Sequence, residues 1–150
     1  MDLCKAFDLV NHDLLLHKLH LYHVNEDSVQ WFQSYLSDRT QMVKINSTLS
    51  PELRSEFGVP QGSILGPLLF LIFINDLPLQ NSSGKITLFA DDATTSVRHK
   101  NLTTVKAELQ QEATNFDMWC KENHMVINTE KTKGMLLTTQ ARHSLSLIHI

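Results

Sequence analysis

An acidic pair between two apolar runs is the feature that most restricts how this chain can fold. Asp91 and Asp92 follow the run Ile86–Ala90 and come directly before Ala93–Val97. Strand-forming residues on both sides place the pair at or near the tip of a β-hairpin. Two adjacent carboxylates repel one another unless a cation lies between them, and Mg²⁺ is typically held by one or two carboxylates plus substrate phosphates. The alternative is a solvated turn, because Asp is common in turns for its own backbone hydrogen bonds.

The composition is that of a globular protein. Of the 150 residues, 42% are hydrophobic and 19% are charged, which indicates one domain or a piece of a larger one. The net charge of −3 lacks the basic signature that nucleic-acid binders usually show, so parts outside this chain would have to supply most phosphate contacts. Cys4 and Cys120 have no paired spacing, which predicts reduced thiols in an intracellular protein.

No membrane or targeting segment is predicted. The longest apolar run, Leu68–Ile74, is far shorter than the ~20 residues that span a bilayer, so it is expected to be a buried helix. Asp2, Lys5 and Asp8 interrupt any apolar region at the N-terminus, which argues against a signal peptide.

Hydrophobic periodicity predicts an α+β fold, with helices layered on an antiparallel sheet. The first helix is expected to begin at Asn11, and the second at an N-cap formed by Asp27 or Ser28. A third should follow the loop Pro60–Ser63 and reach about Leu77, where Pro78 ends it. A fourth should cover Leu102–Asn123. Strands are expected in Met1–Phe7, in a half-buried Thr40–Asn46 paired with Glu52–Val59, beside the acidic pair, and in Met125–Ile127 and Gly134–Leu137. The tail 145–150 looks foreign, so the domain is predicted to cover residues 1–144; the alternative is an ordinary apolar tail.

Four separated segments of the chain resemble the palm motifs A to D of reverse transcriptases, specifically those of non-LTR (LINE-type) retrotransposons. They are Asp2–Asp8, Gly58–Phe70, Phe89–Asp92 and Asn128–Thr132. A lone Asp-Asp pair would be weak evidence, but the ordered set with its long central signature is specific. The resemblance runs to about Leu137 and implies a polymerase palm, in which an antiparallel sheet with a ferredoxin- or RRM-like core packs on helices.

The resemblance also implies an activity, that of an RNA-directed DNA polymerase. Such an enzyme adds dNTPs to a primer on an RNA or DNA template with two Mg²⁺ ions, or Mn²⁺ in their place. Two metals about 3.5–4 Å apart stabilise the attacking and leaving oxygens. The implied metal ligands are Asp2 and Asp91, with assistance from Asp92 and the carbonyl of Leu3. Lys131 is implied to protonate or neutralise the pyrophosphate.

Three further residues are implied to contact the nucleotide. Phe7 corresponds to the sugar gate, where a bulky ring excludes a 2′-hydroxyl, and Gln61 would contact the incoming nucleotide. Gly62 would let the backbone approach closely. Without the resemblance, Phe7 is an ordinary core aromatic, Gln61 a polar loop residue and Lys131 a solvated lysine. Asp8 is expected to fix local structure rather than to bind metal.

The chain departs from the family pattern in ways that bear on its activity. The fingers motifs, primer grip and thumb have no counterpart, so this chain alone is expected to be inactive and to need those missing segments of the same polyprotein. Cys4 stands where the family commonly has Ser. An RNA-dependent RNA polymerase palm is one alternative, against which Phe7 and Ala90 argue; a non-catalytic relic or co-opted binding module is another, weakened by the intact carboxylates. A complete element is expected in the cytoplasm and nucleus.

Overall fold

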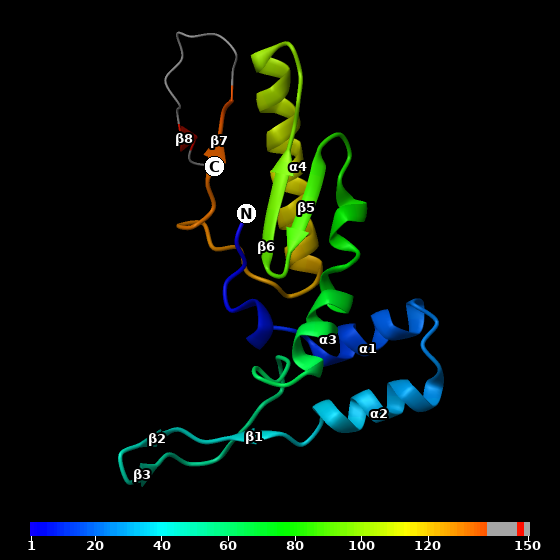
Figure 1. Ribbon diagram of the computed structural model, residues 1–150, viewed down its shortest axis with the longest axis vertical. Coiled ribbons are helices and arrows are strands. Elements are labelled where there is room, and N and C mark those ends of the chain that lie inside the picture. Colours follow the sequence, from blue (N-terminus) through cyan, green and yellow to red (C-terminus); the bar gives the residue numbers. More distant parts are fainter. Residues whose placement is uncertain (138–146, 149–150) are drawn as a thin grey trace. The chain divides into compact units, whose positions relative to one another are not determined.

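The computed structural model describes residues 1–137 and 147–148, and it divides the chain into two compact units. We call Met1–Cys4 together with Leu77–Ile150 the hairpin unit, and Lys5–Asp76 the helical unit. Helices and antiparallel strands occur in both, which confirms the predicted α+β class (Figure 1). In the described part of the chain, no helix is long and apolar enough to cross a membrane.

The hairpin unit contains the predicted acidic hairpin. Strands β5 (Lys85–Phe89) and β6 (Asp92–Ser96) pair antiparallel with Phe89 opposite Asp92, so Ala90 and Asp91 form the connecting turn. Ala90 adopts a φ of 52°, which fits a tight turn. The unit also contains η2 (Leu77–Gln80), α4 (Leu102–Glu122), β7 (Gly134–Met135) and β8 (Leu147–Ile148), the last two paired antiparallel. The acidic pair therefore lies at the hairpin tip, as predicted.

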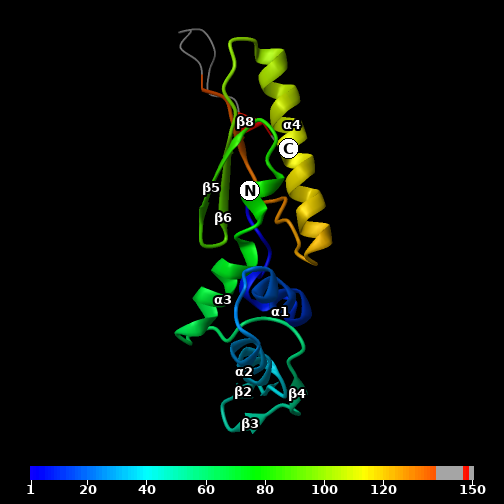
Figure 2. The same ribbon diagram turned by 90° about the vertical axis from the view of Figure 1, so that its right-hand side faces the viewer.

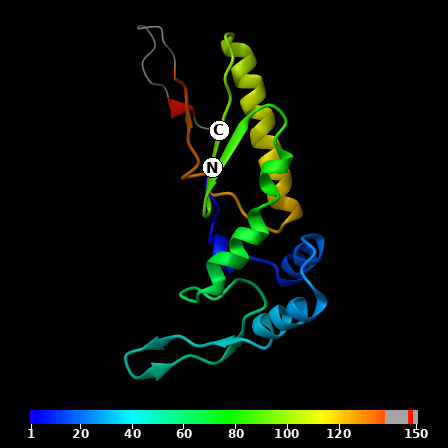
Figure 3. The same ribbon diagram turned by 45° about the vertical axis from the view of Figure 1, so that its right-hand side comes forward.

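The first four residues form an inner strand of the hairpin unit. Met1 and Ala93 exchange backbone hydrogen bonds of 2.6 and 3.1 Å, the pattern of directly opposed residues in an antiparallel pair. On its other side Leu3 bridges Ile127, also antiparallel. The resulting spatial order is β5, β6, the N-terminal segment and then residues 126–128. Figure 3 shows the N-terminus beside the green β5–β6 hairpin. In chain order this is the 4-1-3-2 arrangement of a ferredoxin-like sheet.

Helix α4 supplies the apolar layer behind this sheet. Asn101 caps its start by accepting a hydrogen bond from the amide of Thr103. Phe116 and Trp119 are buried, and the helix runs along the β5–β6 hairpin (Figure 2). Its bounds agree with the predicted Leu102–Asn123 to within one residue.

Glu112 is a buried carboxylate on α4 that sequence analysis did not single out. It is 1% exposed, and its Oε1 accepts hydrogen bonds from the amides of Ser82, Ser83 and Gly84 and from both serine hydroxyls, at 2.8–3.1 Å. Burial opposes ionisation, but these donors outweigh it and lower the pKa of Glu112 to about 2. The carboxylate therefore fastens the loop that leads into β5 to the middle of α4.

The two cysteines are free thiols, as predicted, but their surroundings differ. Cys4 is half-buried on the N-terminal strand, whereas Cys120 is 2% exposed on α4. Burial, with a smaller contribution from Asp117, raises the pKa of Cys120 to about 12. Cys120 therefore stays protonated and packs as an apolar side chain.

The helical unit packs three helices around a small core. Its core includes Val10, Leu15, Leu19, Leu69, Phe70 and Phe73. Its elements are η1 (Ala6–Asp8), α1 (His12–Leu21), α2 (Glu26–Leu36), β1 (Thr40–Gln41), β2 (Lys44–Ile45), β3 (Thr48–Leu49), β4 (Leu53–Arg54) and α3 (Leu65–Ile74). The strand expected in Met1–Phe7 stops before η1, at Lys5, whose φ is 44°.

Two predicted helix boundaries were wrong. Helix α2 is capped by Asn25, which accepts from the amide of Ser28, rather than by Asp27 or Ser28. Helix α3 ends at Ile74 instead of near Leu77. Pro78 has no amide hydrogen to donate to the carbonyl of Ile74, and its ring clashes with that carbonyl, so the helix stops there. Lys18 of α1 donates to the carbonyl of Phe73 at 2.7 Å, close to this end.

The predicted half-burial of the strand at residues 40–46 was also wrong. The expected partner is confirmed for Thr40–Gln41, because β1 pairs with β4, but it was wrong for Lys44–Ile45, because β2 pairs with β3. However, Ile45 is 68% exposed and Leu53 65% exposed. The apolar and polar residues alternate as in a half-buried strand, but the ribbon has only two strands and gives its apolar side chains little to pack against.

Candidate active site

The hairpin unit places Asp2 beside the acidic hairpin. Because Met1 lies directly opposite Ala93, the next pair in the antiparallel register is Asp2 opposite Asp92, with both side chains on one face of the sheet. Burial lowers the pKa of the Met1 amino group, and the negative charges of Asp2 and Asp92 act in the opposite direction. Two carboxylates far apart in the sequence therefore converge. Asp91 is half-buried in the adjoining turn.

The side chain of Asp2 is incompletely satisfied. It is 19% exposed, and its Oδ2 is buried without a hydrogen-bond partner among the described residues. The Nζ of Lys131 lies 3.8 Å from this oxygen, too far for a hydrogen bond, on a side chain that is 73% exposed. A buried carboxylate oxygen without a partner is unfavourable. Asp2 therefore has a free coordination position for a cation.

The carboxylates on this face of the sheet fit a divalent metal only together with oxygen ligands from a bound substrate. Among the described residues, no three His, Cys, Asp or Glu side chains come together as a metal site. Mg²⁺ does not require such a set, since one or two carboxylates and the phosphates of a substrate commonly hold it. Asp2 and Asp92, opposite one another across the sheet, provide two carboxylates, and Asp91 lies in the adjoining turn. The carbonyl of Leu3 belongs to the same strand.

The turn that carries Lys131 is tied to the strand of Asp2. The amide of Asn128 donates to the carbonyl of Asp2 at 2.9 Å, and the amide of Asp2 donates to the hydroxyl of Thr132 at 3.3 Å. Within the turn, the side chain of Asn128 accepts from the amide of Lys131 at 3.2 Å. Sequence analysis assigned no role to Asn128 or Thr132. The preference of Asn for turns was the available signal for the first of these.

The helical unit holds the other predicted site residues. Phe7 is half-buried and stacks on Phe70, with ring centroids 4.5 Å apart and planes at 28°. Gln61 is exposed and donates from Nε2 to Oδ1 of Asp8 at 2.7 Å. Gly62 has a φ of 81°, and a Cβ at this position would meet nothing within 4 Å. A left-handed backbone, rather than a close neighbour within this unit, therefore requires glycine here.

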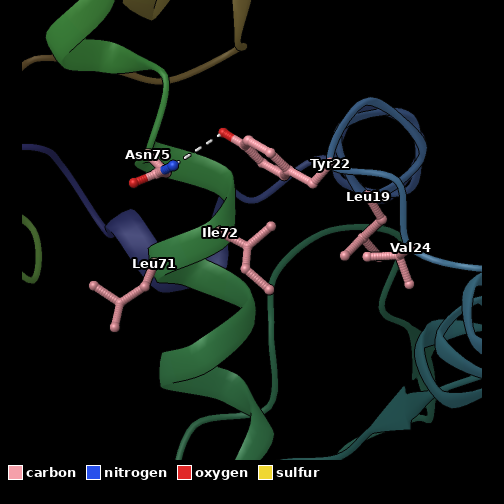
Figure 4. A pocket seen from close by; sticks show the side chains of 6 residues that line it. All are labelled: Leu19, Tyr22, Val24, Leu71, Ile72 and Asn75. Carbon is pink, nitrogen blue, oxygen red and sulfur yellow. Dashed lines mark hydrogen bonds between the residues drawn. The ribbon is translucent and has the colours of Figure 1, made fainter.

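A separate hollow lies between α1 and α3 in the helical unit. It has a volume of about 310 Å³ and is lined by Leu19, Tyr22, Val24, Leu71, Ile72 and Asn75 (Figure 4). Asn75 donates to the hydroxyl of Tyr22 at 3.4 Å across one side. None of these residues belongs to the predicted nucleotide- or metal-binding set, so the hollow is distinct from the candidate site.

Comparison with known proteins identifies the class to which this sheet and its carboxylates belong. The sequence model of the family described as reverse transcriptase (RNA-dependent DNA polymerase) matches residues 1–147. The chain therefore belongs to the reverse transcriptase family, and the resemblance seen in the motifs is confirmed.

Individual relatives are polymerases of transposons and other mobile elements. The chain is 34% identical over 140 residues to the probable RNA-directed DNA polymerase from transposon BS of Drosophila melanogaster, covering 88% of the chain. It is 31% identical over 144 residues to the RNA-directed DNA polymerase from mobile element jockey of the same species, covering 87% of the chain. In each case the match spans 15% of the relative's length.

Proposed function

We propose that this chain carries the nucleotidyl-transfer centre of an RNA-directed DNA polymerase, adding deoxynucleotides to a primer on an RNA or DNA template. The observation that carries the proposal is the pairing of Met1 with Ala93, which sets Asp2 beside the acidic hairpin. The names of the relatives support the same activity. In a complete element the template, primer and dNTP would also contact segments outside this chain, in the cytoplasm or nucleus.

Each charged group has a role in this proposal. Asp2 and Asp91 would hold the divalent ions, Mg²⁺ or Mn²⁺, with Asp92 and the carbonyl of Leu3 in support. When bound, the metals would neutralise charge that develops on the phosphoryl oxygens. Lys131 lies near Asp2 and would be available to the pyrophosphate once the metals occupy the carboxylates.

The helical unit would select the nucleotide. Phe7 is held by its stacking on Phe70 and keeps part of its ring exposed, so it can restrict the space beside the sugar. Gln61 and Gly62 would lie along the nucleotide in the loop between Pro60 and Ser63.

The test is a primer-extension assay in which dNTPs and rNTPs are offered as alternative substrates. The assay is run on the chain itself and on a chimera in which the chain replaces the matching segment of the jockey polymerase. We expect metal-dependent use of dNTPs over rNTPs in the chimera, and Phe7→Val should relax that preference by roughly tenfold or more, because a small steric change in a pocket has about this effect. Equal use of the two sugars by the wild type would contradict the assignment, and a folded chimera that extends no primer would favour a relic.

Lys131 offers a test that needs no polymerase activity. Its positive charge near Asp2 competes with a bound cation, so Lys131→Met should tighten Mn²⁺ binding to the chain by about two- to fivefold, the range for an exposed ion pair. Binding is measured by electron paramagnetic resonance of free Mn²⁺. Lys133→Met, on an exposed lysine of the same segment, is the control. Unchanged or weaker binding in Lys131→Met would show that the two cations do not compete.

A further inference from the structure

The segment that follows the first motif is tightly paired with the segment that precedes the Pro-Gln-Gly loop. The amide of Gly58 donates to the carbonyl of Val10, and the amide of Val59 to that of Phe7, both at 2.8 Å. A Cβ on Gly58, whose φ is 86°, would lie only 2.8 Å from the carbonyl oxygen of Asp8. The two backbones are therefore in direct contact at Asp8, and the position of Asp8 relative to the loop is fixed.

The loop itself is closed on both sides. The amide and hydroxyl of Ser63 donate to the carbonyl of Pro60 at 3.2 and 2.7 Å, and the amide of Gly66 donates to the hydroxyl of Ser63 at 2.9 Å. A Cβ on Gly66 would lie 2.5 Å from the carbonyl oxygen of Pro60. The backbone that carries Gln61 is thus restrained before any ligand binds.

The amide nitrogen of the Gln61 side chain donates to the carboxylate of Asp8 at 2.7 Å. An ionised carboxylate only accepts hydrogen bonds, so the amide nitrogen of Gln61 must face Asp8 and its carbonyl oxygen must face elsewhere. The negative charge of Asp8 also disfavours a phosphate at this place.

We propose that Asp8 is a positioning residue that fixes the carboxamide of Gln61, so that Gln61 meets a hydrogen-bond donor of the nucleotide, a sugar hydroxyl or base N–H group, rather than its phosphates. This rests on the proposed function, in which Gln61 contacts the incoming nucleotide. Asp8 itself touches neither substrate nor metal; it acts through Gln61.

Steady-state kinetics of the chimera separate positioning from a structural role. Asp8→Ala should raise KM for dNTP by roughly tenfold or more, the effect of losing one hydrogen bond to a charged group, and leave kcat within about twofold. Asp13→Ala, on an exposed aspartate at the start of α1, should change neither. A fall in kcat together with thermal stability, at constant KM, would overturn the proposal in favour of a structural Asp8.

A charge exchange tests the orientation itself. Gln61→Glu places two carboxylates together and should impair nucleotide binding more than Asp8→Ala does. Adding Asp8→Asn should restore binding, because the new amide can donate to Glu at position 61 and leave its second oxygen as an acceptor. Additive effects of the two substitutions would contradict the proposal.

A readout in the 150-residue chain distinguishes failure of this inference from failure of the polymerase assignment. In NMR spectra, the side-chain amide protons of Gln61 should shift in Asp8→Ala and stay in place in Asp13→Ala, whether or not the protein extends a primer. Unshifted resonances would refute the positioning contact. Shifted resonances in the chain, together with a folded chimera that extends no primer, would refute the polymerase assignment alone.

Discussion

Asp91→Asn should reduce primer extension by the chimera roughly a thousandfold or more. A bound metal stabilises the charge of the transition state by several kcal/mol, and this stabilisation is lost when the metal is no longer held. Asn has the same shape as Asp and keeps the backbone bonding of a turn residue, so the hairpin should form normally. Mn²⁺ binding to the chain should weaken in parallel. We attribute both expected losses to removal of the negative charge of Asp91, because the shape of the side chain is unchanged.

The thermal stability of Asp91→Asn should be unchanged or slightly higher than that of the wild type. Without metal, Asp91 and Asp92 are adjacent like charges at the hairpin tip, and removing one relieves repulsion. Glu122→Gln, which removes an exposed acidic side chain at the end of α4, is the control for a change of net charge. Extension retained in a folded Asp91→Asn protein would refute the metal assignment.

Glu112→Gln should destabilise the chain by about 3 kcal/mol at pH 7, the free energy that corresponds to a pKa of about 2 instead of the ordinary 4.5. The pKa in the folded state lies below that in the unfolded state. The stabilisation is therefore present above pH 4.5 and is lost as the pH falls toward about 2.

Urea unfolding at a series of pH values measures this effect. The wild type should lose stability between pH 4.5 and about 2, and Glu112→Gln should lose correspondingly less over the same interval. Glu108→Gln, one helical turn earlier on α4, should behave like the wild type. An equal dependence on pH in wild type and Glu112→Gln would show that this carboxylate does not fasten the loop Ser82–Gly84.

The elements that sequence analysis predicted well are those with local signals. The hairpin tip follows from two carboxylates between strand-forming runs, and α4 follows from apolar residues at steps of three or four. The position of Glu112 was also readable, because it falls three residues after Leu109 and four before Phe116, on the buried face. A carboxylate on the buried face of a helix predicts that buried hydrogen-bond donors surround it.

What the sequence did not reveal depends on contacts between distant residues. Lys18 from another helix donates to a carbonyl at the end of α3, and the orientation of Gln61 is set by Asp8, 53 positions away. The inner position of the first strand arises from pairing with Ala93, 92 positions away. Periodicity describes which face of an element is buried, but not which other segment covers it or which polar group completes it.

Because Cys4 is half-buried and Cys120 is fully buried, the chain offers one thiol for attachment of a spectroscopic label. A maleimide nitroxide is expected to modify Cys4 and spare Cys120, which stays protonated in the core until the pH approaches 12. Cys4 lies on the same strand as Asp2, so the nitroxide signal should broaden when paramagnetic Mn²⁺ binds nearby. Metal occupancy could then be followed in the otherwise unaltered chain, without engineering a cysteine.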